Sequence, residues 1–340
     1  MKILVTGGLG FIGSHTVVAL QQKGYEVVII DDLSNASVDV VQGIKAITGV
    51  QPTFYQIDLR EKQAVFDFFE QHTDLAGVIH FAASKAVGES MAKPLLYYEN
   101  NFFSLINVLS ALQHYGIKKF LFSSSCTVYG QGEVMPITEE ESIKSALSPY
   151  GNTKQVGEEI IVDLAKVFPL QAVLLRYFNP IGAHESGHIG ESPLGVPYNL
   201  IPYITQTAVG IREYLSIYGQ DYDTPDGTCV RDYIHVVDLA DAHVRAMEYL
   251  IQEKNQQQVE AFNVGNGQGY SVLELLHSFE RVSGLKINYK IVERRPGDVD
   301  KAWANTDKIQ RVLGWKPTKT LDDMLASAWK WEQKSRNNNN

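Results

Sequence analysis

The stretch KILVTGGLGFIGSHTVVAL, residues 2–20, decides the fold. A short apolar, β-branched run leads into glycines, and an apolar helical pattern follows them. Gly8, Gly10 and Gly13 form the pattern G-x-G-x-x-G, and Gly7 stands directly before it. Such glycines allow a tight turn and let the backbone approach a pyrophosphate at the N-terminus of a helix. The stretch therefore predicts a dinucleotide-binding turn between a first strand and a first helix.

An acidic residue at the end of the second expected strand supports this prediction. The run EVVIID ends at Asp31, about 20 residues after the glycines, where a carboxylate binds the ribose hydroxyls of a dinucleotide. Asp31 would repel a 2′-phosphate, and Asp32 adds to that bias, so the sequence predicts NAD rather than NADP. Asp58 ends the third expected strand, where either a helix cap or an adenine contact fits.

Strand and helix patterns alternate through the first half of the chain. Strands are expected over 2–6, 26–31, 53–58, 77–82, 119–125 and 172–179, and helices over 11–23, 35–48, 61–71, 94–114 and 149–167. This alternation predicts an α/β fold, a Rossmann-type doubly wound parallel sheet. The pattern loosens after residue 180, and helices return over 200–211, 237–252, 271–283 and 320–332.

These patterns predict an NAD-binding Rossmann domain over 1–179 and a smaller, mixed α/β, substrate-binding lobe over 180–336, with some interleaving of the chain. The low-complexity end, 337–340, is expected to be disordered.

Composition narrows the class of protein. The 340 residues are 44% hydrophobic and 20% charged, which is typical of a soluble globular protein. A net charge of −9 argues against nucleic-acid binding through bulk electrostatics. The two cysteines, Cys126 and Cys229, provide no disulfide framework, and neither a signal peptide nor a membrane-spanning run is recognised. We therefore expect a cytoplasmic protein without a membrane partner.

The segment SPYGNTK, 148–154, holds the candidate catalytic pair. Ser148 and Pro149 are a favourable helix start, and the spacing of Tyr150 and Lys154 puts both on one face of that helix. Alone, the pair fits an ordinary amphipathic helix whose polar tips are solvated. The serines at 123–125 change this interpretation, because they end the fifth expected strand at the edge where ligands bind.

A cation near Tyr150 would make its phenol a better base. A unit charge about 4 Å away at an effective dielectric constant of about 20 contributes about 4 kcal/mol, equivalent to roughly three pKa units. We expect Lys154 and a positively charged nicotinamide to lower the pKa of Tyr150 in this way, and Ser125 to share a hydrogen bond with the same substrate hydroxyl.

Seven segments together carry a family resemblance over residues 1–332: TGGLGFIG, HFAASKAVGES, SSSCTVYG, SPYGNTK, LLRYFNPIGAH, VRDYIHVVDLA and RRPGD. The chain resembles the extended short-chain dehydrogenase/reductase family, and within it the UDP-glucose 4-epimerase family. The resemblance implies tightly bound NAD and interconversion of UDP-glucose and UDP-galactose. Tyr150 would take the proton of the sugar 4-hydroxyl while a hydride passes from C4 to NAD. The 4-keto sugar would turn over, and the hydride would return to its other face.

The resemblance also implies roles for individual residues. Lys154 would hold the nicotinamide ribose and tune Tyr150, and Ser125 would bridge to the 4-oxygen. The remaining cofactor contacts would be Gly7, Gly10, Phe11, Ile12, Gly13, Asp31, Asp32, Asn35, Asp58, Leu59, Phe81, Ala82, Lys85, Asn100, Ser123, Tyr177 and Phe178. The UDP-sugar contacts would be Asn179, Asn199, Leu200, Tyr218, Arg231, Arg295 and Asp298.

Departures from the family pattern bear on specificity. Ala83-Ser84 and Cys126 replace residues common in relatives without removing a catalytic group. Ala302 stands where some members carry a large residue that crowds the sugar 2-substituent. We therefore expect room for an N-acetyl group, and turnover of UDP-N-acetylglucosamine and UDP-N-acetylgalactosamine. The resemblance further implies a homodimer in which the helices at 94–114 and 149–167 form a four-helix bundle.

Other functions stay open at this point. A 4,6-dehydratase would need an Asp-Glu pair just after the fifth strand, where this chain has Ser125-Cys126-Thr127. A uronate 4-epimerase or decarboxylase would depend on carboxylate contacts that the sequence does not place. An NAD-binding sensor would not need Tyr150 and Lys154. No metal site is expected, because glycines and Pro180 break the helix that HESGH, 184–188, would need to bind zinc.

Overall fold

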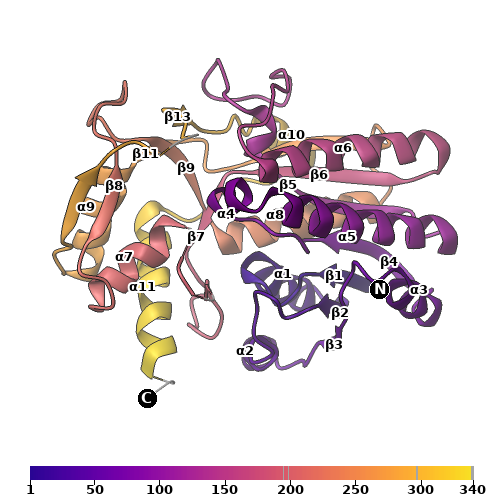
Figure 1. Ribbon diagram of the computed structural model, residues 1–340. Helices are drawn as coiled ribbons and strands as arrows, with labels where there is room; N and C mark the ends of the chain where they lie inside the picture. Colours follow the sequence, from indigo (N-terminus) through magenta and orange to yellow (C-terminus); the bar gives the residue numbers. More distant parts are fainter. Residues whose placement is uncertain (194, 198, 296–297, 338–340) are drawn as a thin grey trace.

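The computed structural model describes residues 1–193, 195–197, 199–295 and 298–337. Its main element is a sheet of seven parallel strands (Figure 1). The strand order along the sheet is β10 (Val259–Val264), β6 (Gln171–Tyr177), β5 (Lys119–Ser125), β4 (Leu75–His80), β1 (Lys2–Thr6), β2 (Glu26–Asp31), β3 (Thr53–Gln56). The direction of winding reverses between β1 and β4, and ligands of such sheets bind at the carboxyl ends of strands beside this point.

Helices cover both faces of the sheet, which confirms the predicted fold class. Neighbouring residues of β1 point to opposite faces, so Ile3 and Val5 join one buried cluster and Leu4 joins the other. The first cluster packs against α1 (Phe11–Gln22), α2 (Val40–Thr48), α8 (Val236–Ile251) and α10 (Asp307–Leu313). The second packs against α3 (Lys62–Gln71), α5 (Pro94–Tyr115) and α6 (Pro149–Val167).

The sheet contains one strand that the sequence patterns did not predict. β10 pairs with β6 at the edge of the sheet, although it lies in the second half of the chain, far beyond residue 180. The helix before it, α8, also packs on this sheet, against α1 and β6. The helix expected over 35–48 begins only at Val40. The other predicted strands and helices of the first half form within a few residues of their expected bounds.

A smaller lobe lies beside the carboxyl ends of the strands, on the left of Figure 1. Its buried cluster joins α7 (Leu200–Ala208), α9 (Val272–Ser283) and α11 (Leu321–Asn337). Its strands are β7 (Asn179–Ile181), β8 (Leu215–Tyr218), β9 (Val230–His235), β11 (Gly269–Ser271), β12 (Tyr289–Val292) and β13 (Lys301–Ala302). β9 pairs antiparallel with β11 and parallel with β7 and β13, so the predicted mixed character of the lobe is confirmed.

A buried carboxylate connects β9 of this lobe to the segment that follows β10. Asp232 accepts hydrogen bonds from the backbone N–H groups of Asn266, Gly267 and Ala304, at 2.7, 3.1 and 3.1 Å. Burial raises the pKa of Asp232 to about 7, and three donors offset part of the cost of burying its charge. No sequence pattern predicted a role for Asp232.

Two further observations concern membrane-spanning helices and the C-terminal end of the chain. Within the described ranges, no helix combines the length and apolar character that crossing a bilayer requires. α11 continues to Asn337, the first residue of the expected disordered tail, and residues 338–340 lie outside the described part of the chain.

Candidate active site

The turn between β1 and α1 is packed too tightly for side chains at two of its glycines. Gly7 has a φ of +66°, and a Cβ there would lie 2.8 Å from the backbone nitrogen of Ala82. A Cβ on Gly13 would lie 2.2 Å from the carbonyl oxygen of Gly7. Gly10 begins α1 without a side-chain cap, so the first N–H groups of the helix are left to bind an anion. Phe11 and Ile12 form this first turn.

Asp31 holds the glycine turn and the end of β2 together. Its carboxylate accepts hydrogen bonds from the backbone of Leu9 at 3.1 Å and of Leu33 at 3.0 Å. Burial raises the pKa of Asp31, while both hydrogen bonds act in the opposite direction. Each oxygen keeps a second lone pair for a ribose hydroxyl. Asp32 accepts hydrogen bonds from Ser34, and Asn35 is exposed beside them.

Asp58 does not cap the next helix, because α3 begins after Glu61. Its carboxylate forms a two-point ion pair with Arg60, with Nη2 to Oδ2 at 2.6 Å, and this hydrogen bond lowers the pKa of Asp58. The side chain of Leu59 is buried, and its carbonyl oxygen accepts a hydrogen bond from Asn107. A contact of Asp58 and Leu59 with adenine remains a proposal.

The candidate catalytic pair is buried rather than solvated. Ser148 caps α6 by accepting a hydrogen bond from the backbone of Gly151 at 3.1 Å, which confirms the predicted helix start. Tyr150 is 8% exposed and Lys154 is 4% exposed, so an ordinary pair with solvated tips is excluded. The ammonium group of Lys154 donates to the carbonyl oxygen of Ser123 at 2.6 Å and lies 5.9 Å from the centroid of the Tyr150 ring.

β5 and β6 bring further polar groups to this place. Ser125 is paired with Tyr177 in the register of the two strands. The hydroxyl groups of Ser123 and Tyr177 are hydrogen-bonded, and both residues are buried. Phe178 is buried directly after β6. The structure thus gathers Ser123, Ser125, Tyr177 and the pair on α6 around one edge of the sheet.

The expected lowering of the Tyr150 pKa by Lys154 together with a positively charged nicotinamide stays a prediction. Burial raises the pKa of Tyr150, although a hydrogen bond with Ser125 acts against the shift. Burial also lowers the pKa of Lys154 to about 7, against the influence of Glu158. Removal of both groups from water therefore disfavours their charged forms, and a phenolate at Tyr150 would need a positive charge beside it.

The loop after β4 carries three other predicted cofactor residues, Phe81, Ala82 and Lys85, and α5 carries a fourth, Asn100. Phe81 and Ala82 lie where this loop meets the glycine turn, and Asn100 donates to the hydroxyl of Ser84 at 3.1 Å. The neighbouring Asn101, which was not predicted, accepts a hydrogen bond from the backbone of Ser84 at 2.8 Å and donates one to Thr153 at 2.9 Å. Asn101 therefore ties this loop to α6. A pair of asparagines inside an apolar helix was the only signal for it.

Lys85 and Asn199, predicted on the cofactor side and on the sugar side, meet at one carboxylate. Oε1 of Glu191 lies 3.7 Å from Nζ of Lys85 and accepts a hydrogen bond of 2.5 Å from Asn199. Leu200 follows as the first residue of α7. Glu191 was not predicted, because an acidic residue in a loop rich in glycine and proline has no distinguishing pattern.

The residues predicted to bind the diphosphate lie on β9 and on the segment before β13. They gather around one carboxylate, that of Asp298. Oδ1 of Asp298 lies 2.8 Å from Nη2 of Arg295 and 3.7 Å from Nη2 of Arg231. Ala302 pairs with Arg231 in the register of β13 and β9. The Cζ atom of Arg295 lies over the Tyr218 ring, 5.7 Å from the ring centroid. One carboxylate connects both arginines, so this arrangement differs from two separate surface ion pairs.

The arginine cluster lies near the residues that follow β5. Burial raises the pKa of the Cys126 thiol to about 12, and the charge of Arg231 acts against this shift. Cys126 directly follows Ser125. Asn179, at the start of β7, donates to the backbone oxygen of Asp232 at 2.8 Å. The predicted sugar-binding residues of β7, β9 and β13 thus belong to one sheet next to the strand end of Ser125.

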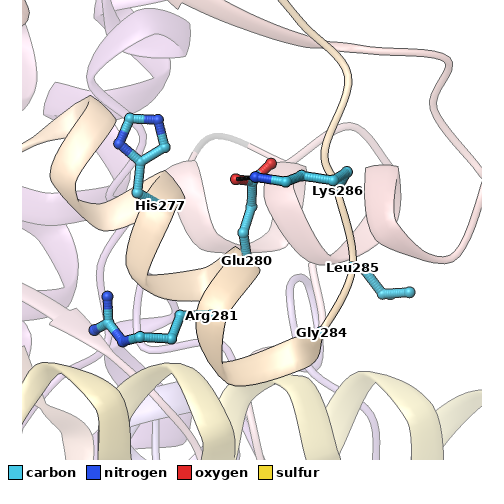
Figure 2. A pocket seen from close by; sticks show the side chains of 6 residues that line it. All are labelled: His277, Glu280, Arg281, Gly284, Leu285 and Lys286. Carbon is cyan, nitrogen blue, oxygen red and sulfur yellow. Dashed lines mark hydrogen bonds and ion pairs between the residues drawn. The ribbon is translucent and has the colours of Figure 1, made fainter.

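Two surface hollows elsewhere in the described part of the lobe contain none of these residues. Figure 2 shows one of about 320 Å³ at the C-terminal end of α9, with an ion pair between Glu280 and Lys286 across it. A neighbouring hollow of about 550 Å³ reaches from α9 to the start of α11. The segment 184–188 forms a turn instead of a zinc-binding helix. The part of the chain that the structure describes contains no group of three or more acidic, histidine or cysteine side chains arranged to hold a metal.

A glycine turn after β1, an acid after β2, serines ending β5 and a buried Tyr-x-x-x-Lys on α6 define the class. The protein is a short-chain dehydrogenase/reductase with a Rossmann fold. The family model described as GDP-mannose 4,6 dehydratase matches residues 4–328.

Individual relatives place the chain more closely. It is 50% identical over 338 residues to the UDP-glucose 4-epimerase of Bacillus subtilis (strain 168), covering 99% of this chain and 98% of that protein. The UDP-glucose 4-epimerase of Bifidobacterium longum in complex with NAD+ and UDP superimposes with a TM-score of 0.95 at 45% identity, covering 99% of both chains. The UDP-glucose 4-epimerase of Stenotrophomonas maltophila, with bound NAD and formylated UDP-arabinopyranose, gives the same values. The chain belongs to the UDP-glucose 4-epimerase family.

Substitution of Gly13 by alanine tests the packing of the glycine turn. Because the new methyl group would overlap the carbonyl of Gly7, we expect Gly13→Ala to lower the free energy of unfolding by about 3 kcal/mol. Gly88→Ala is the control, since a Cβ there meets nothing within 4 Å, and it should change stability by less than about 0.5 kcal/mol. Urea unfolding followed by circular dichroism measures both. Equal stability of the two variants would contradict the packing described.

Proposed function

We propose that this protein interconverts UDP-glucose and UDP-galactose by inverting C4 of the sugar, with NAD as a bound cofactor. The observation that carries the proposal is the burial of Tyr150 and Lys154 beside Ser125, at the carboxyl edge of the parallel sheet. The names of the relatives support the same activity, and two related structures hold NAD.

The residues around the glycine turn fit NAD. The turn admits no side chains at Gly7 and Gly13, and the uncapped start of α1 suits a pyrophosphate. Asp31 offers free lone pairs to a ribose and its charge excludes a 2′-phosphate. When bound, NAD would accept a hydride from C4 and return it, and its oxidised nicotinamide would add positive charge near Tyr150.

The protein's own groups would move the proton. Tyr150 would take the proton of the 4-hydroxyl as C4 loses its hydride, so that the C4–O bond becomes a carbonyl. It would give the proton back when the hydride returns to the opposite face, which leaves no net oxidation. Ser125 would hold the 4-oxygen through both steps. Burial of Tyr150 keeps water away from the 4-keto sugar and strengthens each electrostatic contact.

The UDP group would lie against the smaller lobe. Arg231 and Arg295 would bind the two phosphates, since guanidinium groups match phosphate oxygens with paired hydrogen bonds. Asp298 would hold both arginines in place, as it does by its contacts at 2.8 and 3.7 Å. Contacts with the rest of the substrate are proposed for Asn179, Asn199, Leu200 and Tyr218.

Two other activities fit less well. The family model that matches the chain is named for a dehydratase, but the segment 123–130 that ends β5 and forms η1 (Cys126–Tyr129) contains no carboxylate to eliminate water. A sensor that only binds NAD would gain nothing from burying Lys154, since burial of an ammonium group is costly.

Tyr150→Phe removes the proposed base while keeping the shape of the side chain. We expect kcat for conversion of UDP-galactose to fall by about 10³-fold, within the usual range for loss of a general base, with bound NAD retained. Product is measured without added cofactor. Tyr289→Phe makes the same chemical change at an exposed residue and should leave the rate unchanged. Full activity of Tyr150→Phe would refute the role of this residue.

The size of Ala302 supports a wider substrate range. Ala302 is partly buried against the cluster that includes Val128, Tyr129 and Phe178, and it pairs with Arg231 across β9 and β13. Its methyl group would leave space beside the sugar 2-substituent. We propose that UDP-N-acetylglucosamine and UDP-N-acetylgalactosamine are substrates as well.

A large side chain at 302 should separate the two substrate pairs. We expect Ala302→Tyr to lower kcat/KM for the N-acetylated pair at least about 10-fold, since a steric clash acts on one substrate alone. Turnover of UDP-galactose should stay within about threefold. Ala302→Gly is the control and should keep both activities. If the unaltered protein does not convert UDP-N-acetylgalactosamine, the wider range is wrong.

The proposed division into an NAD-binding domain, 1–179, and a UDP-sugar lobe, 180–336, has α8, β10 and α10 as interleaved elements. We also propose the cytoplasm as the location, in keeping with the free thiols of Cys126 and Cys229.

We propose in addition that two copies associate through α5 and α6. These helices pack against each other and carry exposed apolar side chains, which in water favour a covering partner. The exposed residues are Leu95, Leu96, Phe103, Ile106, Val162 and Val167. A second copy would complete a bundle of four helices.

A charge on this surface should break the association. We expect the unaltered protein to sediment as a dimer and Phe103→Glu to raise the dimer dissociation constant at least about 10-fold, because a buried unpaired carboxylate is strongly unfavourable. Val50→Glu places the same charge at an exposed residue after α2 and should leave the dimer intact. Sedimentation of the unaltered protein as a monomer at micromolar concentrations would overturn this proposal.

A further inference from the structure

A buried ion pair lies one helical turn beyond Lys154. Glu158 on α6 is 5% exposed and Arg176 on β6 is 7% exposed. The guanidinium group contacts both carboxylate oxygens, with Nε to Oε1 at 2.9 Å and Nη2 to Oε2 at 2.6 Å. The hydroxyl of Ser124 donates to Oε1 at 2.5 Å. Three elements, α6, β5 and β6, therefore meet at one carboxylate.

Each partner lies close along the chain to a residue of the proposed active site. Glu158 follows Lys154 by four residues, so the two lie on the same side of α6. Ser124 stands between Ser123 and Ser125 on β5, and Arg176 directly precedes Tyr177 on β6. The ion pair thus fixes the helix that carries the base to the strands that carry the other polar groups.

The same network continues to the far edge of the sheet. Nη1 of Arg176 donates to the hydroxyl of Tyr129 at 3.0 Å, and that hydroxyl donates to Asn263 on β10 at 2.6 Å. Asn263 in turn donates to the backbone oxygen of Ile137 at 2.9 Å. Both carboxylate oxygens of Glu158 thus accept hydrogen bonds within a continuous network of paired polar groups. Buried charges are tolerated under this condition.

Stability alone is a poor explanation for this pair. A buried ion pair often stabilises a fold no more than apolar residues of similar size, because both ions lose their hydration. The pair instead supplies something that apolar residues lack, a fixed negative charge next to Lys154. We propose that Glu158, held by Arg176 and Ser124, is a positioning residue that keeps Lys154 charged and correctly placed for catalysis.

The charges around Lys154 leave this role to Glu158. On β5 the carbonyl oxygen of Ser123 accepts its proton. On β4 His80 faces it, and burial lowers the pKa of His80 to about 3, so this ring is neutral. On β6 burial raises the pKa of Tyr177 to about 12, so that phenol is neutral as well. Tyr150, on α6 itself, is also an uncharged phenol at rest, because burial raises its pKa.

The charges of these groups set the direction in which loss of Glu158 would shift the pKa of Lys154. Burial lowers the pKa of Lys154 to about 7, and the carboxylate of Glu158 raises it. Loss of the carboxylate would lower the pKa of Lys154 further. Lys154 would then lose its proton at a lower pH. This inference rests on the proposed function, because it gives Lys154 its place in the reaction.

The test compares two adjacent glutamates of α6 in the protein with its bound cofactor. Glu158→Gln removes the buried charge, and Glu159→Gln makes the same change at an exposed residue. Lysines labelled with 13C at Cε are titrated by NMR, and the signal missing from Lys154→Met identifies Lys154. We expect Glu158→Gln to lower the pKa of Lys154 by about one unit, and Glu159→Gln to leave it unchanged.

Activity gives a second readout. The fall of kcat at high pH should begin about one pH unit lower in Glu158→Gln, and Glu158→Asp, which keeps the charge, should restore the profile. Should Glu158→Gln not fold, the double variant Glu158→Gln/Arg176→Gln avoids an unpaired guanidinium and should still lower the pKa of Lys154. Equal Lys154 pKa values in the Glu158 and Glu159 variants would overturn the inference. Absence of epimerase activity in the unaltered protein would instead refute the proposed function, whatever the titration shows.

Discussion

The burial of the Lys154 ammonium group is the constraint on which the rest of this site depends. Removal of this group from water lowers its pKa to about 7, so near neutral pH its charge depends on its neighbours. The carbonyl of Ser123 and the carboxylate of Glu158 favour the charged form, and the strands β5 and β6 hold both groups in place. Burial also raises the pKa of the Tyr150 hydroxyl. Tyr150 is therefore a poor base until a further positive charge lies beside it. We propose that the oxidised nicotinamide of NAD supplies that charge when the site is loaded.

The fold explains why these groups meet. The carboxyl ends of parallel strands share one edge, so the glycine turn after β1, the acid of β2 and the serines of β5 lie together although the sequence separates them widely. The smaller lobe then adds Arg231 and Asp298 on the side of Cys126. We propose that the parallel sheet serves cofactor chemistry and the smaller lobe substrate recognition, and carboxylates such as Asp232 and Glu191 join the segments that carry them.

Much of the fold was predictable because its signals are local. The glycines before α1, the Ser-Pro start of α6 and the β-branched runs each act within a few residues, and the structure forms them near the expected positions. β10 escaped prediction, since its place beside β6 depends on a return of the chain after residue 180. The family motifs supplied the candidate site residues, whereas spacing alone did not separate a solvated Tyr-Lys pair from a buried one. Asn101, Glu191 and Glu158 were missed because their partners are distant in sequence.

The central claim is that C4 is inverted by removal and return of its own hydrogen as hydride, while Tyr150 moves only the hydroxyl proton. The most direct measurement follows UDP-galactose deuterated at C4 during conversion by the purified protein without added cofactor. The account predicts that the UDP-glucose formed keeps deuterium at C4 and that none appears in the water. Release of the label into the solvent would contradict it, because the C4 hydrogen would then have left as a proton.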